Sequence, residues 1–541
     1  MSEIGRLLPP RLRSGRIGHS LVVIADHQRQ VARLRLGESP WATGRVVPIV
    51  GPSEAELHEQ LAELGDLAVV VDVRRSSGPA QLRAFERSFF HVGRGGAWVL
   101  LRAGWLPERR EPAVVLARRL QDPRAAMLGR RWREHARSRS FVRITPRAVV
   151  IGQGTRHLLR LRDHEALDLL PLREPSLRVT EIARLDAGEV DTDGLLHEYG
   201  GSPRPQVPPL VPFPMHHVRR YEGAVHLPRT GLAYHGRSVL PDSFRWHLAA
   251  DPQVPGLVNV DDHFGRLRRR QPVETLPGSY FSFGYNNPGH FGHLMTEAVA
   301  KLWGWDAAKA ADPSLKVLCR LHPRGKGGGM ETRLETTLLP AFGIAGDDIT
   351  WVDRPVTVTS LVGCTPMWHN APPFYVHPAI LDTWDRLRTG LLGTDPVGED
   401  RRIFVTRREG KRGCRNVGKV ERFFAARGFR IVAPEELGLA EQAAVFAGAR
   451  VVAGFGGAGM FNLAYARSVE TVIVLNQWSY QARNEHLFAA AHGSELHCSW
   501  SRPNQEHPEG GFSYHAHQSR WAFDFRTNGP PLRRLLDGLV E

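Results

Sequence analysis

The stretch ARVVAGFGGAGMFNLAYA, residues 449–466, decides the fold of the C-terminal third of the chain. Its apolar, β-branched start predicts a buried strand, its glycines predict a turn, and MFNLAYA predicts a helix. A strand that passes through a glycine turn into a helix is typical of a parallel α/β sheet, in which ligands bind at the carboxyl ends of the strands. The stretch therefore predicts a ligand site at Gly454–Asn462.

The neighbouring segments continue this alternation. Strands are predicted for RIFVTRR (402–408), FRIVAPEEL (429–437) and TVIVLN (471–476), and helices for VERFFAARG (420–428) and LAEQAAVFAGA (439–449). Strands that alternate with helices of this length imply parallel pairing. The sequence thus predicts an α/β domain over residues 399–541, which includes a C-terminal tail.

The loop Gly454–Gly459 joins the predicted strand to the predicted helix. Glycine lets backbone amides approach an anion closely, and the N-terminus of a helix adds partial positive charge. A phosphate or diphosphate suits such a loop. The alternative is a turn that needs glycine only for tight packing.

Basic residues follow the first strand of the same predicted domain. They are Arg407, Arg408, Lys411, Arg412 and Arg415. Adjacent strands would bring them near the glycine turn, where planar guanidinium groups suit a diphosphate that gains charge as it departs. The alternative is a solvated basic loop.

Together these residues resemble glycosyltransferase family 61, in which a loop of the form G-x-H-G-A-G-x-x-N follows a fixed series of motifs. The residues that match the series are Arg407, Arg412, Asn416, Gly428-Phe429, Pro434-Glu435, Glu441-Gln442 and Gly454 through Asn462. The spacing holds without a gap from Arg412 to Asn462. The resemblance covers roughly residues 215 to 500, because the family also carries a histidine followed by an acid at a helix start, here His293 and Glu297.

The resemblance implies two Rossmann-like domains in the GT-B arrangement, and an inverting transfer of a sugar from a nucleotide-sugar donor. The acceptor would be a hydroxyl of a saccharide, a lipid-linked saccharide or a natural product. The acceptor-side domain would span residues 215–398. The implied donor-binding residues are Arg407, Lys411, Arg412, Asn416, Gly456, Gly457, Ala458, Gly459 and Asn462.

The segment HFGHLMTEAVAKLWGW, residues 290–305, predicts a helix on which His293 and Glu297 share one face. Inversion needs one group to take the proton of the acceptor hydroxyl, and an imidazole titrates near neutral pH. His293 is the predicted base, with Glu297 either orienting it or acting itself. The alternative is a structural pair. Arginines and amides can replace a metal ion, so no obligatory metal or other cofactor is predicted.

Two positions depart from the family pattern. Gly456 stands where the family has its loop histidine, and Val474 where an acidic residue often ends the next strand. His290, Lys411 and Asn476 are the candidate substitutes. A catalytically degenerate transferase that acts as a carbohydrate- or nucleotide-binding scaffold therefore stays open as the alternative function. The dispersed residues His492, His497, His515 and His517 are expected at the surface rather than in a metal site.

The N-terminal region, residues 1–145, resembles the second half of a class I methyltransferase domain. A strand at LAVVVDV (67–73), a helix through Phe85, and a second strand at GRGGAWVLL (93–101) carry the resemblance. The region lacks an upstream glycine loop for S-adenosylmethionine, so a smaller α/β domain with a structural or protein-contact role is the alternative to an active methyltransferase. Residues 146–214, with the proline-rich SPRPQVPPLVPFP, are predicted to be an irregular linker.

Composition limits the number of domains, the kinds of partner and the compartment that remain to be considered. The chain has 541 residues, enough for about three domains. Its net charge of +15 is dispersed arginine interspersed with acids, which argues against a nucleic-acid partner. No run approaches the ~18 apolar residues of a membrane span, and the four cysteines are single, so a cytoplasmic protein is expected. A lipid-linked acceptor would still bring it to a membrane surface.

Overall fold

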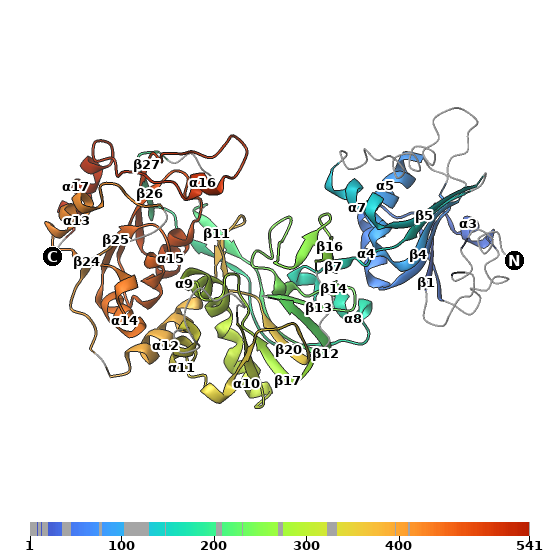
Figure 1. Cartoon of the computed structure of the whole chain (residues 1–541), viewed down its shortest axis with the longest axis horizontal. Helices are drawn as coiled ribbons and strands as arrows, with labels where there is room; N and C mark the ends of the chain where they lie inside the picture. The colour runs from blue at the N-terminus through green and yellow to red at the C-terminus, as the bar shows by residue number, and fades with distance from the viewer. Residues whose placement is uncertain are drawn as a thin grey trace. The chain divides into compact units, whose positions relative to one another are not determined.

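The computed structural model is a mixed α/β protein with several sheets (Figure 1). It describes residues 8, 12, 20–34, 45–74, 78–101, 129–145, 148–201, 208–229, 231–268, 274–321, 333–394, 396–408 and 412–539. Of the residues singled out from the sequence, Lys411 lies outside these ranges. Across the described part of the chain, none of the helices has both the length and the apolarity that a bilayer crossing requires.

The chain divides into two compact units, and each is discontinuous in sequence. The first unit comprises Met1–Thr180, Arg220–Pro277 and Arg354–Ser360, and the second comprises Glu181–Arg219, Gly278–Asp353 and Leu361–Glu541. The contiguous domain boundaries expected at residues 145, 214 and 398 stay a prediction.

The first unit contains a six-stranded sheet in the order β2-β1-β3-β4-β6-β5. Its strands are β1 Ser20–Ala25, β2 Arg45–Val50, β3 Leu67–Asp72, β4 Val92–Leu101, β5 Arg139–Thr145 and β6 Ala148–Gln153. The first four strands pair in parallel and the last two antiparallel. The two strands and the intervening helix expected in this region are confirmed as β3, β4 and α5 (Gly78–Ser88).

The second unit contains the sheet predicted around the glycine loop, and every neighbouring pair in it is parallel. The order is β10-β27-β26-β25-β23-β24, with β10 Leu196–Tyr199, β23 Arg402–Val405, β24 Arg430–Val432, β25 Val451–Phe455, β26 Thr471–Gln477 and β27 Glu495–Ser501. The predicted helices are present as α13 (Val417–Ala425) and α14 (Leu439–Gly448). The segment after the glycines is a 3-10 helix, η12 (Ala458–Tyr465).

The edge strand β10 comes from the segment 146–214, for which the sequence predicted no regular structure. Its four residues pair in parallel with the first part of β27, about 300 residues later in the chain. This distant partner gives β10 its conformation, since four residues show too little periodicity to predict a strand.

Further parallel strands of the second unit lie in the middle of the chain. The last residues of β17 (Thr275–Ser282) pair with β18 (Lys316–Arg320), which pairs with β19 (Ile349–Val352). The helix predicted at 290–305 is present but irregular. It consists of α9 (Phe291–His293), a π-helical segment (Leu294–Ala298) and a 3-10 segment (Val299–Gly304), and the π segment is fully buried. Such π segments are frequent at functional sites.

Candidate functional site

The candidate site lies at the carboxyl ends of β23 and β25. Val405, the last residue of β23, pairs with Gly454 of β25, so the residues that follow the two strands are neighbours. As a result, Nη2 of Arg407 donates a hydrogen bond to the carbonyl oxygen of Gly456 at 3.1 Å. The expectation that the basic segment and the glycine loop meet is therefore confirmed.

The guanidinium groups of Arg407 and Arg412 both lie close to Gly457. Its φ is +141°, in the region that favours glycine. A Cβ atom there would clash with Nη2 of Arg407 and lie 3.0 Å from Nη2 of Arg412. The absence of a side chain lets two guanidinium groups lie directly against the backbone.

Arg412 is held in place by the C-terminal part of the chain. Its backbone has a φ of +64°, its N–H donates to the carbonyl oxygen of Gln518 at 3.2 Å, and its carbonyl accepts from Nε1 of Trp521 at 2.9 Å. Its guanidinium lies 4.7 Å from the ring centroid of Tyr480 and 3.3 Å from Nε2 of His517. The residue is fixed by contacts that the local sequence does not reveal.

Two amides of the glycine loop are hydrogen-bonded within the protein. The N–H of Gly456 donates to the carbonyl oxygen of Leu475 at 3.1 Å, and the N–H of Gly457 donates to Oε1 of Glu485 at 2.6 Å. At these two positions, the glycines bring backbone close to the guanidinium groups instead of presenting amides to a ligand.

Glu485 is the functional candidate that sequence reasoning missed. It lies in the first turn of α15 (Asn484–His492), 28 residues after the loop, and only 1% of it is exposed. Burial raises the pKa of its carboxyl, while the N–H of Gly457 and the charges of Arg412 and Arg407 act in the opposite direction. The one available signal was an acid in the first turn of the helix after β26.

A cavity of about 440 Å³ opens beside these groups. Its lining contains five arginines and no carboxylate. The lining residues are Arg407, Arg408, Arg412, Gly413, Cys414, Arg415, Val417, Phe455 and Arg520. Burial, and then the charge of Arg412, lowers the pKa of Arg407. An anion in the cavity would relieve this repulsion, which makes the cavity a candidate anion site.

The charges in this lining are not equivalent. The guanidinium of Arg408 lies 3.0 Å from a carboxylate oxygen of Glu421 and 3.3 Å from one of Glu436. Its charge is therefore balanced by neighbouring acids. The guanidinium of Arg412, by contrast, lies against the ring of Tyr480 and 3.3 Å from Nε2 of His517.

Two predicted donor-binding residues hold the chain together. Asn416 accepts the N–H of Phe523 and donates to the carbonyl oxygen of the same residue, both at 2.9 Å. Asn462 is buried, and its Nδ2 donates to the carbonyl oxygen of Gly459 at 3.1 Å. Gly459 in turn packs against Val405, whose Cγ1 would lie 3.1 Å from an added Cβ. A contact of these residues with a donor stays a prediction, as it does for Ala458, the first residue of η12.

The position where family 61 has its loop histidine is closed in this chain. A Cβ on Gly456 would lie 2.5 Å from Nδ2 of Asn476. Among the described substitutes, Asn476 has its side chain against this position, whereas Lys411 lies outside the described residues. Its Oδ1 accepts the N–H of Gln477 at 2.9 Å, which orients the amide.

His293 and Glu297 form the pair that their spacing predicted. Nδ1 of His293 lies 2.5 Å from Oε1 of Glu297, and Oε2 of Glu297 accepts the N–H of Asn286 at 2.8 Å. His290 precedes α9, accepts the N–H of His293 at 3.4 Å, and places its ring 4.9 Å from that of His293. The carboxylate is thus fixed by the backbone and in turn fixes the imidazole.

The helix that carries this pair packs on the helix that follows the glycine loop. A Cβ on Gly292 would lie 2.9 Å from Cε2 of Phe461, and Met295 lies 3.9 Å, sulfur to oxygen, from the hydroxyl of Tyr465. Both helices belong to the second unit. The geometry therefore joins the predicted base and the predicted donor site through one shared core.

Residues 291–474 match the family model described as Glycosyltransferase 61. Over these residues the chain is similar to glycosyltransferase family 61. The matched residues include the His293–Glu297 pair, both loop arginines and the glycine loop. The resemblance inferred from the motif series is thus confirmed.

Other comparisons add little to the family 61 match. No curated protein matches the chain. Among solved structures, a methyltransferase of the mycinamycin biosynthetic pathway, in complex with Mg, S-adenosylhomocysteine and mycinamycin VI, is similar with 17% identity and a TM-score of 0.20. A crystal form of the same methyltransferase with Mg and S-adenosylhomocysteine gives 16% identity and the same TM-score. Each match covers 25% of this chain and 45% of the methyltransferase, so the chain spans less than half of that protein's length.

Replacing Gly457 by alanine should weaken anion binding, because the added methyl group displaces the two guanidinium groups. Loss of a charge-assisted contact of about 1.5–3 kcal/mol corresponds to a roughly 10–100-fold higher Kd for inorganic pyrophosphate. Isothermal titration of the full chain measures this Kd. Gly418→Ala is the matched control, since a Cβ there meets only Nη1 of Arg422 at 3.5 Å. Equal pyrophosphate affinity in the Gly457→Ala protein would contradict the placement of the anion.

Proposed function

We propose that this protein is an inverting glycosyltransferase that moves a sugar from a nucleotide-sugar donor to a hydroxyl of a saccharide, a lipid-linked saccharide or a natural product. The observation that carries the proposal is the arginine-lined cavity beside the glycine loop, inside a family 61 domain. A diphosphate is the part of a nucleotide sugar that needs such a charge. The cavity volume of about 440 Å³ accommodates a group of this size.

The donor diphosphate would lie against Arg407 and Arg412. Both guanidinium groups lie where a side chain on Gly457 would be, so they are positioned before a ligand arrives. Planar guanidinium groups donate two parallel hydrogen bonds to phosphate oxygens, and their charge stabilises the diphosphate as it gains negative charge. The remaining donor contacts predicted for Lys411, Asn416, Asn462 and the loop glycines belong to this proposal.

The acceptor would be activated by His293. The hydrogen bond from Nδ1 to Glu297 favours the tautomer that carries its proton on Nδ1 and a lone pair on Nε2. In one displacement, Nε2 takes the proton of the acceptor hydroxyl, the oxygen forms a bond to the anomeric carbon, and the bond from that carbon to the diphosphate oxygen breaks. The nucleoside diphosphate leaves with the electron pair, and the configuration inverts.

The proposed architecture is the GT-B pair, with an acceptor-side domain over residues 215–398 and a donor-side domain over 399–541. The parallel sheet around the glycine loop and the parallel strands β17, β18 and β19 support it. Residues 1–145 would form a preceding α/β domain with a structural or protein-contact role.

A scaffold without catalysis is the second candidate function. The feature that favours it is Gly456, because the amide of Asn476 lies where the family histidine would start. Binding of a nucleotide sugar without any turnover across plausible acceptors would support the scaffold. Slow hydrolysis of the donor would support the transferase.

Arg412→Ala should abolish most of the affinity for the donor diphosphate while the protein still folds. Because Arg412 has a φ of +64°, Arg412→Gly is the better-matched variant, as glycine accepts this backbone without strain. We expect at least about 10–100-fold weaker binding in both variants. The measurement is thermal stabilisation by a panel of UDP, GDP, CDP and TDP sugars.

Arg408→Ala is the control for this experiment, because Glu421 and Glu436 already balance the charge of Arg408. It should bind the donor about as well as the unmodified protein. Undiminished nucleotide-sugar binding by the folded Arg412 variants would remove the phosphate from the proposed position.

His293→Gln should abolish turnover but keep donor affinity, because the base acts on the acceptor. Loss of a general base costs about 10²–10⁴-fold in kcat. Glu297→Gln should retain part of the rate, since the amide still orients the imidazole. His290→Gln serves as the comparison. If it removes the rate and His293→Gln does not, the base is His290 and the assignment is wrong.

The transfer should need no metal ion or other cofactor, because the arginines supply the charge that a metal would supply. Treatment with EDTA is expected to leave turnover unchanged at a temperature well below unfolding. Turnover that EDTA abolishes and Mn²⁺ restores would contradict this.

We place the reaction in the cytoplasm, where single thiols such as the buried Cys319, Cys364 and Cys498 stay reduced. A lipid-linked acceptor would add peripheral association with a membrane.

A further inference from the structure

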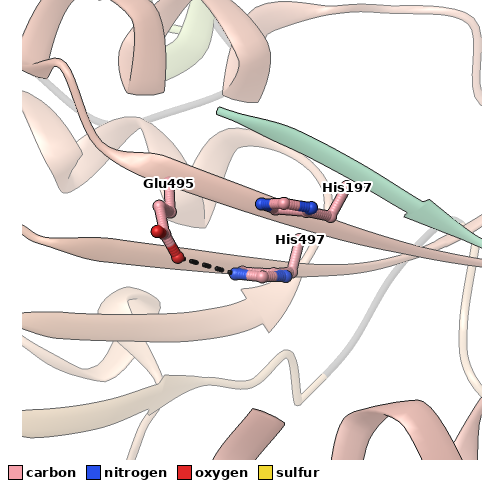
Figure 2. A group of neighbouring side chains, drawn as sticks. All are labelled: His197, Glu495 and His497. Atoms are coloured by element: carbon pink, nitrogen blue, oxygen red, sulfur yellow. Dashed lines mark hydrogen bonds and ion pairs between the residues drawn. The ribbon is translucent and has the colours of Figure 1, made fainter. Parts of the chain in front are cut away.

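Three side chains with metal-binding atoms meet at one edge of the sheet in the second unit. His197 of β10 is paired in register with His497 of β27, so the two imidazoles lie on the same face. Glu495 lies two residues before His497 on the same strand, which places its side chain on that face as well. Figure 2 shows the three side chains gathered above strands that are far apart in sequence. The sequence expectation that His497 is a surface residue is wrong, because strand pairing buries it.

The distances suit a metal ion. One ligand atom from each of the three residues lies within 4.8 Å of the others. Nε2 of His497 is 3.3 Å from Oε2 of Glu495, which is long for a hydrogen bond. Two ligand atoms at about 2.0–2.2 Å from a tetrahedral Zn²⁺ lie roughly 3.3–3.6 Å apart. The observed separation is therefore that of two ligands of one ion.

We propose that His197, Glu495 and His497 bind one divalent transition-metal ion of the Zn²⁺ type, and that the ion fastens β10 to the rest of the sheet. Two imidazoles and one carboxylate are a ligand set that Zn²⁺ accepts, with water in the fourth position. The side chain of Glu495 is 56% exposed, so water reaches the open position.

Tyr199 gives His497 the orientation that a ligand needs. The hydroxyl of Tyr199 lies 3.0 Å from Nδ1 of His497. When Nδ1–H donates to this hydroxyl, the lone pair is on Nε2, which faces Glu495. Hydrogen bonds of this kind fix the tautomer of most metal-binding histidines.

Binding requires one movement. The rings of His197 and His497 are stacked, with centroids 4.5 Å apart and planes 12° from parallel. Stacked rings cannot both direct a lone pair at one ion, so the ring of His197 must turn about its side-chain bonds. Among the residues that the structure describes, none makes a hydrogen bond to this ring. The turn therefore costs little more than the stacking contact.

The position of this site predicts a structural role. Glu495 is the first residue of β27 and pairs with Thr471, the first residue of β26, which pairs with Val451, the first residue of β25. The ligands thus lie near the amino ends of the strands, whereas the arginine-lined cavity follows their carboxyl ends. The metal should change stability and leave sugar transfer unaffected.

The test uses the full chain, first stripped with EDTA and dialysed, and Zn²⁺ alone as the probe. Isothermal titration should show one site that is lost in His197→Ala and in Glu495→Gln, both of which change side chains at the sheet edge. Tyr199→Phe should weaken this site by about 10–100-fold, the usual cost of losing such a supporting hydrogen bond. Zn²⁺ should also raise the Tm of the unmodified chain and not that of the two ligand variants.

His164→Ala is the control, because His164 is exposed and lies in the first unit. It should bind Zn²⁺ as the unmodified chain does. Thermal unfolding without metal checks that each variant is folded. Co²⁺ absorption typical of a tetrahedral nitrogen and oxygen site, lost in His197→Ala, would support the ligand set. The same Zn²⁺ stoichiometry and Kd in folded His197→Ala and Glu495→Gln proteins would overturn the proposal.

Discussion

The hydrogen bond from Gly457 to the buried carboxylate of Glu485 is the contact on which the candidate site depends. It spans 2.6 Å and ties the glycine loop to the helix after β26. It also places this carboxyl near Arg407 and Arg412, whose charges lower its pKa against the larger effect of burial. Together with the bond from Gly456 to Leu475, this contact holds the glycine loop close to the two guanidinium groups.

The hydrogen bond from Gly457 to Glu485 also indicates what Gly456 and Gly457 do in the loop. In many nucleotide-binding loops, successive amides point at the phosphates. Here the amides of Gly456 and Gly457 are used within the protein, by Leu475 and Glu485. The glycines at these positions make room, for Asn476 at one and for the two arginines at the other. In the proposed site, side chains rather than these two backbone amides would contact the anion.

Local pattern was enough to predict the alternating strands and helices of residues 402–476, and the i, i+4 spacing was enough to predict the contact of His293 with Glu297. Both depend on neighbours in the sequence. The partners of Asn416 and Arg412 lie about 100 residues later, in the C-terminal tail. The sequence alone therefore did not distinguish a polar motif residue that faces a ligand from one that forms hydrogen bonds within the protein. Glu485 was missed for the same reason, since its partner is 28 residues away.

The edge strand β10 has a consequence for the order in which the protein folds. Glu198 accepts a hydrogen bond from Trp500, 302 residues further along the chain, and its neighbours pair with β27 throughout. During synthesis, this strand leaves the ribosome long before its partner exists, and it has no other strand of that sheet to join. Contacts of such high sequence separation form slowly, because the loop between them must close first. The sheet that carries the candidate site is therefore completed only after β27 has been made, about 300 residues after β10, and until then β26 has no partner on that side.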